Sequence, residues 1–215
     1  MKCEYSWHRS TRTEIRKTKK RENKEMRKQK GFSLIELLIV VAIILIIAAI
    51  AIPNLLRAKI SANESSAVGS VRNIITGEAS FNSSYPQYGY AITIDQLGAG
   101  AGNFACPAGG PTATAACLLD SALAGANPSF KSGYGFRADS DGASAVLDPN
   151  TGILMQTSFT ASASPINFNK TGVRQFCAGD DGVMRQNPNT AGQSGAQNFN
   201  RWDANCVNAP WLILQ

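Results

Sequence analysis

The sequence predicts an α+β protein in which a long amino-terminal α-helix packs on an antiparallel sheet of about four strands. The first observation is an unbroken apolar run that passes into a stretch with apolar residues at every third or fourth position, as in an amphipathic helix. The second is a set of short alternating segments, bounded by Gly, Pro and Asp, in the carboxyl-terminal half. The 215 residues suffice for one domain with a moderate core.

Positive charge is concentrated in the amino-terminal tail. The formal net charge is +6, yet residues 1–31 hold 12 Lys or Arg against 4 Asp or Glu, and the rest of the chain holds 9 against 11. A basic tail can bind nucleic acid. This tail adjoins an apolar segment, and Lys and Arg beside such a segment hold that flank in the cytoplasm. We therefore expect a topological role and no nucleic-acid binding by the tail.

An apolar segment follows the tail. Leu37 to Ile52 contains no polar side chain, and the stretch that begins at Phe32 is interrupted only by Ser33 and Glu36. At about 1.5 Å per residue, this stretch would be roughly 31 Å long as a helix, close to the ~30 Å of a bilayer's hydrocarbon core. The segment is therefore predicted to cross a membrane as a helix.

Two ordinary interpretations of this segment remain open. A secretory signal peptide would be cut after small residues, for which Ala49-Ile50-Ala51 could serve, although the apolar run is slightly long for one. A plain signal anchor explains both the length and the charge. Neither explains Glu36, because a carboxylate costs about 2.5–3.5 kcal/mol at the centre of a membrane helix and less near its end. Such a residue normally has a partner or a function. The alternative is that the Glu36 side chain extends to the membrane surface and has no role.

The helix is predicted to continue to about Phe81 and to end before Tyr85-Pro86. Proline removes a helix hydrogen bond and clashes with the preceding turn, so we expect a kink at Pro53. Beyond it, an apolar stripe should face a globular head. The stripe consists of Ile60, Ala67, Val68, Val71, Ile74, Ile75 and Phe81. The expected outward face holds Arg57, Lys59, Asn63, Glu64, Arg72, Asn73 and Glu78.

One of the five cysteines, Cys3, lies in the basic tail. The other four follow the apolar segment, an even number that suits two disulfides outside the cytoplasm: Cys106, Cys117, Cys177 and Cys206. Four cysteines allow three pairings, of which proximity in sequence favours 106 with 117 and 177 with 206. Buried free thiols are the alternative. A zinc site is disfavoured, because the sequence has no CxxC and its only histidine, His8, lies in the tail.

The head is predicted to begin with an irregular connection and to continue with strands. Residues 85–130 are rich in Gly, Ala and Pro, with short helical pieces expected near 93–97 and 116–124. The expected strands cover residues 133–137, 153–161, 173–177 and 183–185. Asp180-Asp181-Gly182 supplies a turn between the last two. The tail 187–215 is expected to form a terminal loop closed by a disulfide through Cys206.

Neither a metal site nor a catalytic set is predicted. Four carboxylates near glycine turns could offer oxygens to calcium, but we favour a plain turn interpretation for them: Asp139, Asp141, Asp180 and Asp181. A Ser-His-Asp or Cys-His site is excluded beyond the tail, because no histidine is present there. No phosphate-binding loop is found either. We expect a protein that is not an enzyme and has no cofactor.

The octapeptide from Lys30 to Leu37, Lys-Gly-Phe-Ser-Leu-Ile-Glu-Leu, resembles the processing motif of type IV pilins and of type II secretion pseudopilins. The resemblance to a type IVa-like major pilin precursor implies that a prepilin peptidase cuts between Gly31 and Phe32 and methylates the new amino terminus at Phe32. It implies a pilin fold with three parts: a basic leader at 1–31, a transmembrane and filament-core helix at 32–52, and a head at 53–215. Met26 to Gly31 would suffice as a leader, so residues 1–25 are expected to be a misassigned start or a real extension.

The same resemblance gives Glu36 a purpose. In a filament its carboxylate would face the new amine of a neighbouring subunit, which makes it an assembly residue. Motifs of the head also resemble heads of some bacterial type IV pilins, so that the resemblance covers about residues 31–186. These motifs are Lys131-Ser132-Gly133-Tyr134, Pro165, Thr171-Gly172-Val173-Arg174-Gln175-Phe176 and Gly182-Val183-Met184-Arg185.

The function implied by the resemblance is that of a structural subunit of a type IV pilus, serving adhesion, twitching motility or DNA uptake. The alternative is a pseudopilin of a type II secretion system, and a plain membrane-anchored or secreted domain is a third interpretation. The implied partners are further copies of the chain, minor pilins, the prepilin peptidase and, indirectly, the assembly platform and its ATPase. The implied location is the inner membrane, with a cytoplasmic amino terminus, before assembly and an extracellular pilus afterwards.

Overall fold

The computed structural model describes residues 31–103, 105–140, 145–149, 151–188, 206 and 211–214. The chain divides into two compact units, one ending at Leu45 and the other beginning at Ile46. Helix α1 (Leu34–Ser84) has residues in both units. The predicted leader, apart from its last residue Gly31, lies outside the described residues.

The first unit contains the beginning of α1. The Ser33 carbonyl accepts hydrogen bonds from the backbone N–H groups of Glu36 (3.1 Å) and Leu37 (3.2 Å), which closes the first turn. Every described residue of this unit is exposed. The predicted helix is thus present over the apolar run. Within the first unit, the side chains of this run are not buried against any other part of the described chain.

The part of α1 in the second unit runs through Pro53 and ends three residues beyond the predicted end, at Ser84. Its buried residues are Glu64, Ala67, Ser70, Val71, Ile74, Gly77, Glu78 and Phe81. The predicted apolar stripe is therefore confirmed at its centre. The assignment of Glu64 and Glu78 to the outward face is wrong, because both side chains are buried against the head.

The head contains more strands than the roughly four predicted. One antiparallel sheet has the order β1 (Ser129–Lys131), β2 (Tyr134–Ser140), β5 (Phe159–Pro165), β6 (Gln175–Gly179), β7 (Arg185–Asn187) and β8 (Leu212–Ile213). A separate antiparallel pair joins β3 (Ala145–Leu147) to β4 (Leu154–Gln156). Three of the four predicted strands correspond to β2, β6 and β7, each shifted by one or two residues at its start.

The predicted strand at 153–161 is wrong as a single element. It splits into β4 and the start of β5, which belong to different sheets. The predicted terminal loop is incomplete, because Leu212 in β8 pairs with Gln186 in β7 and adds an edge strand. The rest of the tail, apart from the described residues 206 and 211–214, lies outside the described part of the chain.

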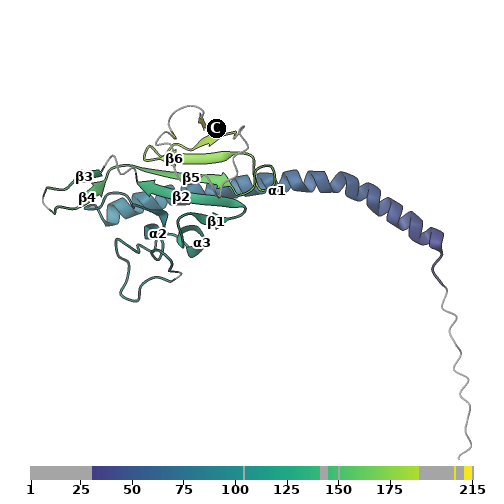
Figure 1. The fold of residues 1–215 in the computed structure, drawn as a ribbon, viewed down its shortest axis with the longest axis horizontal. Helices are drawn as coiled ribbons and strands as arrows, with labels where there is room; N and C mark the ends of the chain where they lie inside the picture. The colour runs from purple at the N-terminus through teal and green to yellow at the C-terminus, as the bar shows by residue number, and fades with distance from the viewer. Residues whose placement is uncertain are drawn as a thin grey trace, which may run out of the picture. The chain divides into compact units, whose positions relative to one another are not determined.

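The core lies between α1 and the six-stranded sheet, as Figure 1 shows for the carboxyl-terminal half of the helix. Phe81 from α1 joins Tyr134, Phe136 and Phe176 from the strands, and all four side chains are almost fully buried. Small residues such as Ala161 on β5, which is central in the sheet, leave room for these rings. The helix and the sheet thus bury the apolar surface that neither could bury alone.

Two short helices lie in the connection between α1 and β1. Helix α2 (Ile94–Leu97) agrees with the predicted piece, whereas α3 (Ser121–Ala124) covers only the end of the second one. Residues 116–119 are not helical because their N–H groups bond to α2 and the residue after it instead, as in Ala116 N to Gln96 O (2.8 Å). Gly98, which follows α2, lets the end of α3 approach closely, since a Cβ there would lie 2.6 Å from the Ala124 carbonyl oxygen.

Candidate assembly site

The predicted processing and assembly residues lie at the start of α1. The Phe32 side chain is 76% exposed, and Glu36 is the acidic residue of the first turn. A carboxylate there is favoured by the positive end of the helix dipole. The spacing of Ser33 and Glu36 is also that of a capping box, a local signal for the helix start that the prediction did not use.

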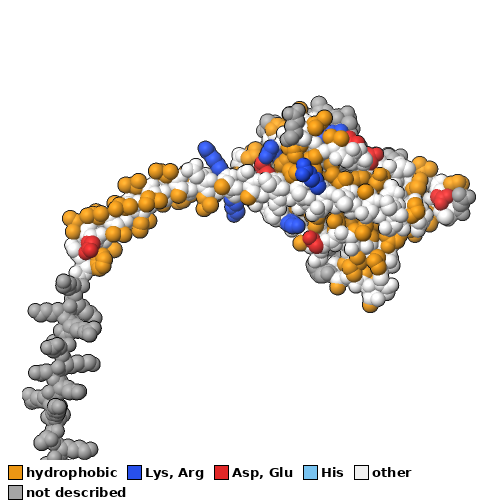
Figure 2. All heavy atoms as spheres, turned by 180° about the vertical axis from the view of Figure 1, so that it is seen from behind, with side chains coloured by type: hydrophobic (Ala, Val, Ile, Leu, Met, Phe, Trp, Pro, Cys, Tyr) orange, Lys and Arg blue, Asp and Glu red, His pale blue; other side chains and the backbone are white. Residues whose placement is uncertain are grey.

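The residues from Leu37 to Ile52 form an apolar helix surface. Their large side chains range from 46% exposed at Val41 to 65% at Ile50, and hydrophobic side chains cover the face seen in Figure 2. Within the described residues, α1 is the one helix long and apolar enough to cross a membrane, and none of its most apolar window is buried. A surface of this kind requires lipid or other apolar helices around it.

Glu64 fastens α1 to the connection between β5 and β6. Its Oε1 accepts hydrogen bonds from the backbone N–H groups of Val173 and Arg174, both at 3.0 Å. Its Oε2 accepts from Arg174 Nε at 2.8 Å, and Arg174 also donates to Gln186 Oε1 at 2.9 Å. Burial opposes ionisation of Glu64, but the two N–H groups and Arg174 outweigh it, so the pKa of this carboxyl lies below its ordinary value.

Glu78 lies further along the same helix and has a different environment. Its side chain is fully buried, its Oε2 accepts from Ala91 N at 2.9 Å, and its Oε1 has no hydrogen-bond partner among the described residues. Burial is the main cause that raises the pKa of Glu78 to about 8. The hydrogen bond from the Ala91 N–H acts against this and lowers the pKa, while the charge of Asp139 raises it by a smaller amount. The head therefore holds this carboxyl in its neutral form at neutral pH.

The candidate calcium carboxylates are largely engaged with arginines. Asp139 pairs with Arg137 and accepts from Asn127 Nδ2, while Asp181 accepts from Arg185 at 3.1 Å and 2.5 Å. The neighbouring Asp180 is exposed, and Asp141 lies outside the described residues. No group of three or more metal-binding side chains occurs in the described ranges. The arginine pairs favour the turn interpretation, and the absence of a metal stays a prediction.

The structure joins the cysteine pairs that proximity favours. Cys106 is bonded to Cys117 and Cys177 to Cys206, with Cα–Cα distances of 5.9 Å and 6.0 Å. The first bond closes a loop whose carboxyl end is held beside α2, because Cys117 N donates to Gly98 O. The second ties β6 to the tail.

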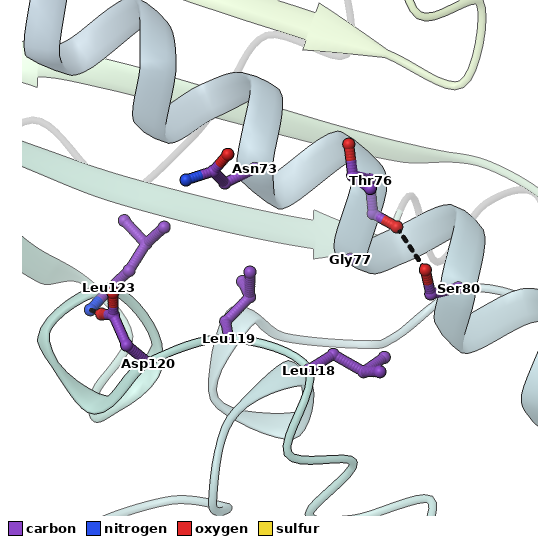
Figure 3. A pocket seen from close by; sticks show the side chains of 8 residues that line it. All are labelled: Asn73, Thr76, Gly77, Ser80, Leu118, Leu119, Asp120 and Leu123. Carbon is purple, nitrogen blue, oxygen red and sulfur yellow. Dashed lines mark hydrogen bonds between the residues drawn. The ribbon is translucent and has the colours of Figure 1, made fainter.

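A hollow of about 300 Å³ lies between α1 and residues 118–123. Figure 3 shows Asn73, Thr76, Gly77 and Ser80 from the helix opposite Leu118, Leu119, Asp120 and Leu123. Gly77 lets Leu119 approach, since a Cβ there would lie 3.3 Å from the Leu119 Cγ. Gly77 therefore makes room for Leu119 against the helix. From the sequence alone, a glycine at this position indicates only a locally weaker helix.

Comparison with known proteins finds similarity around the start of α1. Residues 26–52 match the family model of the prokaryotic N-terminal methylation motif. Over 39 residues (18% of this chain, 30% of the relative) it is 67% identical to the type IV wide pilus major component PilA4 of Thermus thermophilus. Over 61 residues (28% of each chain) it is 44% identical to the type IV major pilin protein PilA of Myxococcus xanthus.

The matches cover less than a third of the length of these curated relatives, and no solved structure matches the chain. The matched motif contains Gly31, Phe32 and Glu36, the residues singled out from the sequence. In the second unit, the carboxyl-terminal part of α1 packs on an antiparallel sheet. The chain thus carries a segment similar to the amino-terminal segment of type IV pilins, followed by an α+β, pilin-like fold.

Proposed function

We propose that this protein is a structural subunit of a type IV pilus, cut between Gly31 and Phe32 and polymerised through the helix that begins there. The observation that supports this most is the methylation motif on a helix whose large apolar side chains before Pro53 are exposed. Lipid covers this surface in the membrane-inserted subunit, and the helices of other subunits cover it in the filament.

Glu36 aligns the subunits in this proposal. Cleavage creates an amine at Phe32, which is positively charged at neutral pH because an α-amino group has a pKa of about 8. When the helices pack away from water, an unpaired carboxylate is costly, whereas a carboxylate next to an amine is tolerated. The pair forms only in the correct stagger, so the charge selects the register of neighbouring helices.

The proposed division of the chain follows from these roles. Residues 1–31 form the leader, 32–52 the membrane and filament-core helix, and 53–215 the head with the amphipathic part of α1. Before assembly, the basic leader holds the amino terminus in the cytoplasm and the helix lies in the inner membrane. The partners are further copies and minor pilins, the prepilin peptidase, and indirectly the platform and ATPase of the assembly machinery.

The cut is tested by the mass and amino-terminal sequence of the protein isolated from cells. We expect a chain that starts at a methylated Phe32, and Gly31→Val should retain the leader because it replaces the glycine after which the proposed cut is made. Gly69→Val is a matched control, since a Cβ at this helical glycine meets nothing within 4 Å. A wild-type chain that starts after Ala51, or that keeps its leader, would contradict the proposal.

The use of the filament is a further part of the proposal, namely adhesion, twitching motility or DNA uptake. Deletion of the gene should remove surface filaments together with at least one of these activities. Loss of protein secretion with surface filaments intact would instead indicate a type II secretion pseudopilin. The pilus is favoured because both matched relatives are major components of type IV pili.

A further inference from the structure

The exposed apolar surface of α1 continues past the predicted end of the membrane segment. In the second unit it includes Leu55, which is 69% exposed, and Leu56, which is 56% exposed. The polar side chain beside them, Asn54, is bonded within the helix, since its Nδ2 donates to a carbonyl one turn earlier at 3.1 Å. The 20 residues 37–56 would be about 30 Å long as a helix, the thickness of a bilayer's hydrocarbon core. The apolar surface thus ends immediately before Arg57.

Two cationic side chains follow this surface, Arg57 and Lys59. Both residues are exposed, and neither side chain forms an ion pair or hydrogen bond with another described residue. Positions two apart in an α-helix differ by about 200°, so the two side chains leave opposite sides of the helix. Figure 2 shows Lys or Arg side chains on both sides of the helix near the head. A partner on one face of the helix would reach only one of them, whereas a layer that surrounds the helix reaches both.

A third cation comes from the connection between β5 and β6. Lys170 is exposed, and its side chain also has no partner among the described residues. The next residue, Thr171, accepts a hydrogen bond through its carbonyl from Asn63 Nδ2 at 2.8 Å. Asn63 lies one turn beyond Lys59 on the same side of α1, so this connection meets the helix close to the first two cations. We call Arg57, Lys59 and Lys170 the basic collar.

The two segments that form the basic collar contain no carboxylate. Residues 46–63 and 166–174 include no Asp or Glu. The next carboxylate along the helix, Glu64, is already bonded to Arg174 at 2.7 Å. In the proposed topology, the collar lies on the outward side of the membrane, where the bias of Lys and Arg toward the cytoplasm does not explain it. The collar therefore suits an anionic layer around the helix.

We propose that the basic collar binds the phosphate groups of anionic phospholipids in the membrane leaflet next to the head. This inference rests on the proposed insertion of α1 in the membrane. The guanidinium of Arg57 can donate two parallel hydrogen bonds to one phosphate, while the two lysines act as compact charges. Lipid binding then fixes the depth of the helix, with Leu56 in the hydrocarbon layer and Arg57 among the headgroups.

The test follows one amide of the full-length chain in micelles of a non-ionic detergent. Lys59 is the one lysine in the sequence that follows an alanine. Labelling with ¹³C in alanine carbonyls and ¹⁵N in lysine therefore gives a single Ala–Lys resonance, which reports directly on the collar. We expect phosphatidylglycerol added to the micelles to shift this resonance to saturation. If it produces no saturable shift, the proposal is overturned.

Three other titrations identify the partner. Phosphatidylcholine with the same acyl chains carries a neutral headgroup, so it should give no saturable shift, and the same is expected of inorganic phosphate and of a short DNA duplex. Saturation by phosphatidylcholine at the same mole fraction as phosphatidylglycerol would contradict recognition of anionic lipid. A saturable response to inorganic phosphate or DNA in the absence of phosphatidylglycerol would show that the collar is no lipid-specific surface, and would also overturn the proposal.

The contribution of the collar is measured by the mole fraction of phosphatidylglycerol at half-saturation. We expect Arg57→Gln and Lys170→Gln each to raise it about fivefold, the effect of one cation beside an anionic surface. Arg72→Gln is the matched control, because it removes an exposed cation from α1 outside the collar and should keep the wild-type value. The basic tail is the same in all these chains. Wild-type values in both Arg57→Gln and Lys170→Gln would overturn the proposal.

Failure of this inference is distinguishable from failure of the proposed function. A chain that is cut after Gly31 in cells, but whose Lys59 resonance does not respond to phosphatidylglycerol, would keep the proposed function and remove the collar. A chain that responds to phosphatidylglycerol and keeps its leader in cells would do the reverse.

Discussion

Glu64 and Glu78 lie on the same helix and are both buried, yet their carboxyl groups have opposite electrostatic surroundings. Two backbone N–H groups and Arg174 stabilise the charged form of Glu64. Glu78 is completely buried and has a single N–H donor, from Ala91, while the charge of Asp139 opposes its ionisation. The difference illustrates that depth of burial and the number of donors together decide whether a carboxyl is ionised.

The raised pKa of Glu78 makes the stability of the head depend on pH. The pKa of Glu78 is about 8 in the folded chain and near 4.5 in the unfolded chain. Between pH 4.5 and pH 8, this carboxyl is therefore protonated in the folded state and ionised in the unfolded state. Its contribution to stability is therefore full below about pH 4.5, declines as pH rises, and is lost above about pH 8. We expect Glu78→Gln to remove this decline, which amounts to a few kcal/mol at most.

The measurement is the free energy of unfolding of the full-length chain between pH 5 and pH 9. Asp180→Asn removes an exposed carboxylate and should retain the wild-type slope. A Glu78→Gln chain with the wild-type slope would show that another group is responsible.

At the scale of elements, α1 was largely predictable and the sheet was less so. The apolar run, and the recurrence of apolar residues at every third or fourth position around Val71 and Ile74, can be read from a short stretch of sequence. The burial of Glu64 was not predictable in this way, because its donors lie about 110 residues further along the chain. Strand β8 has only two residues, both exposed, and therefore leaves no alternating pattern.

The junction of α1 with the β5–β6 connection depends on Glu64. Glu64→Ala leaves two N–H groups and Arg174 without their acceptor, so we expect a loss of about 2–4 kcal/mol in the free energy of unfolding. Glu64→Gln keeps an acceptor oxygen and should lose less. Ser66→Ala, on the same helix, removes an exposed hydroxyl contact with Ser132 and should change stability by less than about 0.5 kcal/mol.

Chemical denaturation of the full-length variants measures these losses. Because the pKa of Glu64 is lowered in the folded chain, its contribution is present above the ordinary glutamate pKa and is lost as pH falls through the lowered value. A Glu64→Ala chain as stable as Ser66→Ala would contradict the role assigned to this carboxylate.

At the scale of the whole molecule, the amino-terminal motif was easier to predict from the sequence than the structure of the head. The residues from Gly31 to Glu36 lie in one short motif that matches a family model, so roles can be proposed for them without a three-dimensional structure. A cavity of about 220 Å³ in the head brings together residues from Phe81 to Gln156, which form no local pattern in the sequence. Matched relatives do not help there, because the similarity covers less than a third of the chain's length.

The alignment role of Glu36 is testable in the assembled filament. We expect Glu36→Gln subunits to be cut normally and to remain in the membrane, but to yield at least tenfold fewer filaments because the amine at Phe32 loses its charged partner. Immunoblots of sheared surface filaments and of membranes measure the two pools. Asp95→Asn, which removes a head carboxylate in the first turn of α2, is the control. Normal filament yield from Glu36→Gln would contradict the role.

The bond between Cys177 and Cys206 has a consequence for a protein exposed to proteases. Any single cut between these cysteines, which are 29 positions apart, leaves the two fragments covalently joined. The segment that carries β8 would then stay beside β7 instead of diffusing away. A chain cut in this way would keep its edge strand. The cut would separate the two fragments on a reducing gel but not on a non-reducing one.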